Sequence, residues 1–110
     1  MGFGEKQIQD NVMPFILKID RRAISDIQNS IDYYSSKQKG LGKKFLLEVK
    51  KHFAVLSEQP FYQVRYSNVR CLPLKKFPFM IHYVVSEEKN EIIVYAVIHT
   101  SLSPIEYPQK

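Results

Sequence analysis

The stretch that decides the fold is residues 20–60, DRRAISDIQNSIDYYSSKQKGLGKKFLLEVKKHFAVLSEQP, because one apolar spacing occurs in it twice. The first set of apolar residues consists of Ala23, Ile24, Ile27, Ile31 and Tyr34. Their intervals of one, three, four and three positions place them along one face of an α-helix. The first half of the stretch therefore predicts an amphipathic helix.

The second half of the stretch repeats the same intervals. Its apolar residues are Phe45, Leu46, Val49, Phe53 and Leu56. Asp20 is suited to cap the first helix, and Pro60 ends the second. Only the short segment at residues 40–42 separates the two patterns, and so short a connection favours antiparallel neighbours. We therefore expect a helical hairpin whose two apolar stripes face a common sheet.

Strand patterns lie on both sides of the hairpin. Residues 14–19 alternate apolar Phe15, Leu17 and Ile19 with other side chains, and Pro14 is tolerated at a first strand position. After residue 68, β-branched and aromatic residues dominate three segments, 69–75, 79–85 and 91–98. Short connections make these three an antiparallel meander. The predicted fold is α+β in the order β-α-α-β-β-β, a helical hairpin on a small, antiparallel-rich twisted sheet.

The chain has the length of one domain. With 110 residues it has room for a single core, which we place at residues 14–110, and we expect residues 1–13 to be a flexible N-terminal segment. Cys71 is the only cysteine, so no disulfide can form within the chain and a reducing compartment is expected. Neither a membrane-length apolar run nor a leader pattern is present, which together predict a cytoplasmic protein.

Charge suggests the class of partner. The 16 Lys and Arg residues exceed the 11 Asp and Glu residues and give a formal net charge of +5. Nucleic acid or an acidic protein would both suit such a chain, although modest positive charge also serves solubility alone. His52 and His82 lie apart in the sequence without metal-ligand spacing, so we read them as surface or core-edge residues and expect no metal or cofactor.

The order of these features resembles the RelE/ParE toxins of type II toxin-antitoxin systems. In the first half, the resemblance is carried by Asp26, Ile27, Tyr33, Tyr34, Gly40, Leu41, Gly42 and Phe45. In the second half, which is similar to the ParE-like branch, it is carried by Val69, Arg70, Phe77, Pro78, Phe79, Ile81, Tyr83, Val97, His99 and Pro104. The resemblance spans residues 14–107, and the order and spacing of these residues, more than any one of them, carry it.

The resemblance implies a toxin that a co-expressed antitoxin neutralises by wrapping a segment over it. RelE-like toxins cut messenger RNA in the ribosome, whereas ParE-like toxins are associated with poisoning DNA gyrase and plasmid stabilisation. RNA cleavage requires cations that stabilise the phosphorane charge. Met80 occupies the strand position at which RelE-like toxins have an arginine, and Leu102 replaces a second arginine. These two replacements argue against an RNA-cleaving enzyme of the RelE type.

Four cations remain as candidates for binding a target or the antitoxin. They are Arg70, Lys75, Lys76 and Arg65, the last in a loop-like stretch. The alternative interpretation is that Arg70 pairs with a helix carboxylate and that the lysines protect an exposed strand end.

Two further residues are weak catalytic candidates. His99 ends the last predicted strand, where an imidazole can move a proton or simply bond a loop. Tyr107 resembles a C-terminal tyrosine of RelE-like nucleases, and it would also serve as a packed lid. The sequence thus favours a toxin that binds an antitoxin and an essential target such as gyrase. The alternatives are a ribosome-dependent endoribonuclease and a decayed toxin that retains only antitoxin binding.

Overall fold

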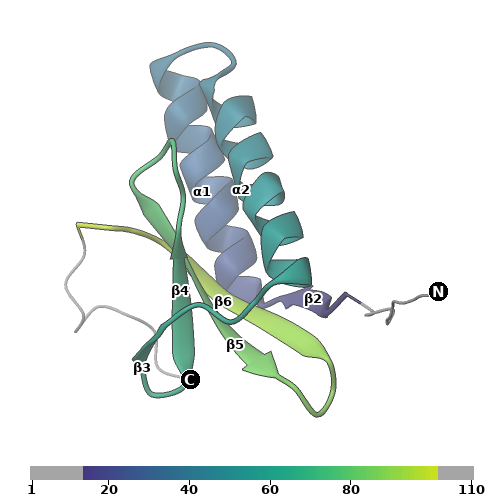
Figure 1. The fold of residues 1–110 in the computed structure, drawn as a ribbon. Coiled ribbons are helices and arrows are strands. Elements are labelled where there is room, and N and C mark those ends of the chain that lie inside the picture. Colours follow the sequence, from purple (N-terminus) through teal and green to yellow (C-terminus); the bar gives the residue numbers. More distant parts are fainter. Residues whose placement is uncertain (1–13, 102–110) are drawn as a thin grey trace.

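The computed structural model describes residues 14–101, in which two helices pack on a five-stranded sheet (Figure 1). The elements in chain order are β2 (Ile16–Ile19), α1 (Arg21–Lys37), α2 (Leu41–Glu58), β3 (Val64–Tyr66), β4 (Val69–Pro73), β5 (Phe79–Ser86) and β6 (Glu91–His99). The predicted hairpin and α+β class are confirmed. The expectations for residues 1–13, Leu102, Pro104 and Tyr107 fall outside the described residues.

The two helices begin and turn where the sequence indicates. The Asp20 carboxylate accepts the Arg22 backbone N–H at 3.1 Å and caps α1. Gly40 precedes α2 with φ of 84°, a left-handed conformation that glycine adopts without steric cost. At Gly42 the helices approach so closely that an added Cβ would lie 2.5 Å from the Ile31 carbonyl oxygen. Glycine at these two positions therefore permits the tight hairpin.

The sheet has the strand order β2-β6-β5-β4-β3. The last four strands in the chain form an antiparallel meander, whereas β2 joins the edge of β6 in parallel, with Ile16 opposite Glu91. The register of β5 and β6 shifts between His82 and Tyr83. Near this irregularity, the Val97 N–H donates to the Asp26 carboxylate of α1 at 3.0 Å. A helix side chain thus accepts a hydrogen bond from a backbone N–H of β6.

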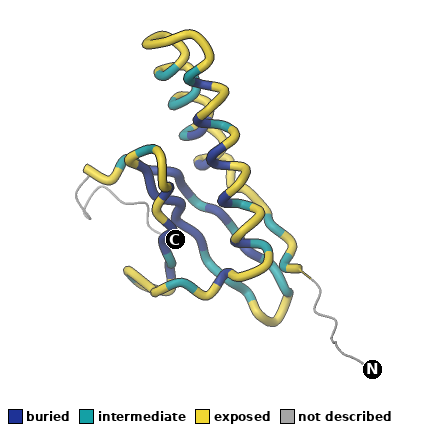
Figure 2. The backbone as a smooth tube through the Cα atoms, turned by 45° about the horizontal axis from the view of Figure 1, so that its top comes forward, coloured by how far each residue is buried: buried dark blue, intermediate teal, exposed yellow. Residues whose placement is uncertain are grey.

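The core lies between the helical hairpin and one face of the sheet (Figure 2). Its buried members are Ala23, Ile27, Phe45, Val49, Leu56, Leu72, Leu74, Phe79, Ile81, Tyr83, Ile92, Val94 and Val97. Tyr83 also donates its hydroxyl to the Pro60 carbonyl at 2.7 Å, which ties the segment after α2 to β5. Most of the predicted stripe residues are confirmed here. Ile24 is a correction, since it is 55% exposed at the edge of the α1 stripe.

Two predictions about the strands need correction. The stretch around Arg65, expected to be a loop, is the edge strand β3, which is only three residues long and pairs irregularly with β4. The strand expected at 69–75 ends at Pro73. The reason is that the N–H groups of Lys75 and Lys76 bond to Glu48 of α2 and not to a neighbouring strand. The strands at 79–86 and 91–99 each extend one residue beyond the prediction.

No helix within residues 14–101 combines the length and apolar character needed to cross a membrane.

Candidate functional site: a basic groove beside α2

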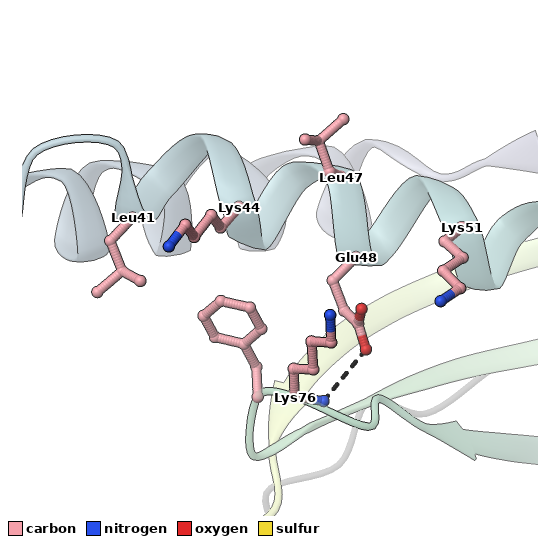
Figure 3. A pocket seen from close by; sticks show the side chains of 7 residues that line it. Leu41, Lys44, Leu47, Glu48, Lys51 and Lys76 are labelled. Atoms are coloured by element: carbon pink, nitrogen blue, oxygen red, sulfur yellow. Dashed lines mark hydrogen bonds between the residues drawn. The ribbon is translucent and has the colours of Figure 1, made fainter.

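A hollow of about 510 Å³ lies between α2 and the connection that joins β4 to β5. Its lining residues are Leu41, Lys44, Leu47, Glu48, Lys51, Lys76 and Phe77. Figure 3 shows that Leu41, Lys44, Glu48 and Lys51 project from α2 toward the connection, whereas Leu47 projects outward. Lysines therefore surround a partly apolar hollow, and Leu47 contributes to its rim.

Glu48 is the structural centre of this hollow. Its side chain is 5% exposed, and its Oε2 accepts the backbone N–H groups of Lys75 at 3.0 Å and Lys76 at 3.1 Å. Burial raises the pKa of this carboxyl, but the two N–H donors and the nearby charges of His52 and Lys51 outweigh burial and lower the pKa overall. Glu48 therefore stays ionised and holds the connection against α2.

A second hollow, of about 130 Å³, continues along the same helix. It is lined by Lys51, His52, Val55, Tyr62, Leu72, Pro73 and Lys75. Lys51 lines both hollows, so the two adjoin beside α2. We call this combined feature the α2 groove. Four lysines line it, Lys44, Lys51, Lys75 and Lys76, and Glu48 is the one acidic residue among its described lining residues.

The structure separates the four predicted binding cations. Lys75 and Lys76 lie in the α2 groove, with exposed side chains. Arg70 is half-buried on β4, where its guanidinium donates to the Tyr62 carbonyl and lies 5.4 Å from the centre of the Phe61 ring. Its observed partner is thus a backbone carbonyl, and not the helix carboxylate of the alternative interpretation. Arg65 is exposed on the edge strand β3.

The His99 side chain makes two contacts within the fold. Its Nδ1 accepts the Ser101 N–H at 3.0 Å, and its ring meets Phe79 edge to face with the centroids 5.2 Å apart. Met80, at the position expected to lack a cation, is 8% exposed on β5. Within residues 14–101, no group of three or more His, Cys, Asp and Glu side chains is arranged to hold a metal ion.

A buried polar cluster occupies the neighbouring strands β3, β4 and β5. The His82 Nδ1 lies 3.0 Å from the Tyr66 hydroxyl and 3.4 Å from the Cys71 Sγ. Burial lowers the pKa of His82 to about 4, helped by the charges of Arg65 and Arg22. Burial raises the pKa of the Cys71 thiol to about 11, although the charge of Arg65 opposes this. A neutral imidazole beside a neutral thiol provides neither a general acid nor a nucleophile at neutral pH.

The two buried histidines differ from the expected surface or core-edge placement. His82 is fully buried, and His52 is 5% exposed with its Nδ1 2.8 Å from the Glu48 carbonyl oxygen. Sequence reasoning also missed Glu48. Its position three residues after Phe45 and one before Val49 places it on the buried stripe, and a carboxylate there was the available signal.

Comparison with known proteins identifies the family. The model of the family described as "ParE toxin of type II toxin-antitoxin system, parDE" matches residues 17–103. Since this match covers most of the chain, the protein belongs to that family. It is a toxin of the type II toxin-antitoxin class, within the RelE/ParE superfamily.

Solved structures share the fold. The chromosomal ParDE system of P. aeruginosa matches with a TM-score of 0.69 at 20% identity, over 79% of this chain and 97% of that one. The intact E. coli RelBE toxin-antitoxin complex matches with a TM-score of 0.59 at 17% identity, over 80% of this chain and 99% of that one. A RelBE complex of Mycobacterium tuberculosis matches with a TM-score of 0.53 at 15% identity, over 78% of this chain and 98% of that one. A search of curated proteins finds no match.

Proposed function

We propose that this toxin acts by binding an essential protein target, DNA gyrase, and that a co-expressed antitoxin neutralises it in the cytoplasm as part of a plasmid-stabilisation module. The observation that carries the proposal is the apolar, buried character of the sheet around Met80. Met80 pairs with Pro73 and Ile98, and both Met80 and Ile98 are less than 9% exposed. This part of the sheet therefore offers a phosphodiester no cation.

The described acid-base groups support the same reading. Cleavage of RNA through its own 2'-hydroxyl requires a base, an acid and a cation placed around one phosphate. His82 is buried with a lowered pKa, and the His99 Nδ1 is engaged by the Ser101 N–H. Arg70 is bound to Tyr62 on the helix-facing side. Each of these three groups therefore has a partner within the fold, which favours a structural role over cleavage.

Charge and the related complexes support an antitoxin partner. The similar structures from P. aeruginosa and E. coli are toxin-antitoxin systems. The net charge of +5 and the lysines of the α2 groove favour an acidic protein partner.

The test is controlled expression of the chain in a bacterial host, followed by three readouts: growth, transcript integrity and plasmid topology. The proposal predicts growth arrest, full-length transcripts, and relaxation of plasmid DNA as gyrase activity falls. Co-expression of an antitoxin, if one is encoded beside the toxin gene, should restore growth. The double substitution of Arg70 and Lys75 by alanine serves as a comparison, since an endoribonuclease that used these residues would lose cleavage.

Two results would reject the proposal. Transcripts cut in wild-type cells but intact with the Arg70 and Lys75 double variant would assign the chain to the ribosome-dependent nucleases. Normal growth with folded protein, combined with antitoxin binding, would identify a decayed toxin.

A further inference from the structure

We propose that the far end of the helical hairpin binds the phosphate backbone of double-stranded DNA without reading its sequence. This end consists of residues 37–44, which join α1 to α2 and contain Lys37, Lys39, Lys43 and Lys44. We call these four residues the lysine tip. The inference goes beyond the proposed function, because it assigns a second surface and a second kind of partner.

The net charge of the chain is concentrated at this end of the hairpin. Residues 37–51 hold six of the 16 Lys and Arg residues but one of the 11 Asp and Glu residues, which leaves ten of each kind elsewhere. The one acidic residue of the segment, Glu48, is 5% exposed and already accepts the N–H groups of Lys75 and Lys76. The formal charge of +5 therefore belongs to one short part of the fold.

The lysine tip is open to solvent. All four of its side chains are exposed, and none of them forms an ion pair with another residue of the described range 14–101. The end of the hairpin projects beyond the sheet (Figure 1), and residues 35–40 are exposed throughout (Figure 2). Like charges held close together repel one another, so a polyanion that neutralises them is a favoured partner.

The other exposed residues around the tip favour a phosphate backbone over a protein surface. They are small or polar, namely Ser35, Ser36, Gln38 and Gly40. The centre of a protein interface is enriched in aromatic residues, methionine and arginine, and it is depleted in lysine. Every cation of the tip is a lysine, whose compact charge meets a phosphate without a fixed orientation. This composition suits an anionic polymer better than an acidic protein.

A duplex suits the tip better than a single strand. Single strands are held by several aromatic faces on which successive bases stack. Tyr33 is the one exposed aromatic residue of residues 33–47, and the Lys37 Nζ lies 5.1 Å from the centre of its ring. Tyr34 and Phe45 pack against each other with their ring centroids 5.5 Å apart. Residues 33–47 therefore offer no stacking platform, and the backbone is the part of a nucleic acid that they can hold.

The width of the tip allows each lysine its own phosphate. Two packed helices lie about 8–10 Å apart, so the tip measures about 20 Å across with its side chains. A duplex carries one charge for about every 1.7 Å of its axis, which gives about twelve charges over that width. The four lysines can therefore contact four different phosphates, and about four contacts are expected.

The test measures binding of the full chain to a fluorescent duplex of about 20 base pairs by anisotropy, over a range of salt concentrations. Each phosphate contact adds about −0.9 to the slope of log affinity against log salt concentration. Four contacts predict a slope of about −3.6, so the affinity should fall about 150-fold between about 50 and 200 mM salt. A duplex of scrambled sequence should bind equally well, since phosphate contacts carry no sequence information.

Substitution of three tip lysines tests whether the tip makes these contacts. The variant K37Q, K39Q and K43Q leaves Lys44 unchanged, because Lys44 also lines the α2 groove. It should lower the affinity at least about tenfold and bring the slope to about −0.9. The variant K37R, K39R and K43R keeps the charge and should restore the affinity to within about twofold of wild type.

A matched variant controls for net charge. The substitutions K18Q, R21Q and K89Q remove the same charge at exposed positions in β2, at the start of α1 and in the turn after β5. These positions lie at the other end of the molecule from the tip (Figure 1), so the slope should change by less than about 0.5. Urea unfolding of each variant checks that the fold is retained.

Four results would overturn the inference. They are an absence of binding to the duplex, equal slopes for the two glutamine variants, tighter binding to a single strand of the same length, and tighter binding to polyglutamate of the same charge. The last result would assign the tip to an acidic protein partner.

The inference and the proposed function fail separately. A chain that inhibits gyrase but binds no duplex would overturn the inference and leave the proposed target in place. A chain that binds the duplex through the tip but leaves gyrase active would support the inference and reject the proposed target.

Discussion

Removal of the Glu48 carboxylate should destabilise the fold by an amount that its hydrogen bonds determine. Glu48 accepts two backbone N–H groups, from Lys75 and Lys76, at 3.0 and 3.1 Å. Hydrogen bonds to a charged group contribute about 1.5–3 kcal/mol each, against about 1 kcal/mol for neutral pairs. Glu48 is nearly buried but lines the larger hollow, so removal of its carboxylate lets water reach the freed N–H groups and partly replace what is lost. We therefore take the lower end of these ranges.

The variants Glu48→Gln and Glu48→Ala separate charge from bonding. Glutamine keeps an acceptor oxygen but no charge, so we expect a loss of about 1–2 kcal/mol in the free energy of unfolding. Alanine removes both hydrogen bonds and should cost about 2–4 kcal/mol. Urea denaturation at pH 7 measures both values. Glu58→Gln, at the exposed end of the same helix, removes one negative charge and should leave stability within about 0.5 kcal/mol.

The pH dependence provides an independent check on the same carboxylate. The folded pKa of Glu48 lies below its ordinary value of 4.5, so the stabilisation that it contributes is present above pH 4.5 and is lost as the pH falls from there through the lower folded pKa. The difference between wild type and Glu48→Gln should therefore shrink in acid. Amide exchange at Lys75 and Lys76 should quicken in the alanine variant. Unchanged exchange, or an alanine variant as stable as wild type, would refute the role assigned to Glu48.

Three further predictions concern the core. Burial lowers the pKa of His82 from 6.5 to about 4, so its neutral form stabilises the fold above pH 6.5. The free energy of unfolding of the wild type should therefore fall by about 2 kcal/mol between pH 7 and pH 5. An equally steep fall in His82→Gln would contradict this. Gly42→Ala should lower the free energy of unfolding by at least about 2 kcal/mol, because the added Cβ meets the Ile31 carbonyl. Gly40→Ala has open space but a positive φ, and should lower it by about 1 kcal/mol. Denaturant midpoints in the reverse order would be evidence against the close helix contact. The Cys71 thiol, with its pKa raised to about 11, should react with a disulfide reagent at pH 8 only after unfolding in urea, and rapid labelling of the native chain would show that the site is open.

The helical hairpin could be predicted from sequence because its signals are local. Ala23, Ile27, Phe45 and Val49 recur at helical intervals, and each is buried as that spacing indicates. Ile24 occupies the margin of the stripe, where its exposure depends on how far the sheet extends under α1.

The pairing of strands was harder to predict because it is non-local. Parallel pairing of β2 with β6 joins residues more than seventy positions apart, such as Ile16 and Glu91. The three-residue strand β3 is too short for its alternation to be visible, and it exists through its pairing with β4. The bend that ends β4 depends on Glu48, a residue of a distant helix.

The candidate site could be anticipated only in part. Lys75 and Lys76 were identified from the sequence, and they lie in the α2 groove. Lys44 and Lys51 also line the groove, and the sequence does not show what lies opposite their face of the helix. Roles for Arg65, Arg70, His99 and Tyr107 in binding or catalysis stay predictions.

Gyrase-catalysed supercoiling of a relaxed plasmid tests the central claim most directly. Purified full-length chain is added in increasing amounts to gyrase, plasmid and ATP, and the topoisomers are separated on a gel. The account predicts a dose-dependent loss of supercoiled product that the antitoxin reverses. Full supercoiling at every dose, together with cut messenger RNA when the same preparation is added to a translating extract, would contradict it.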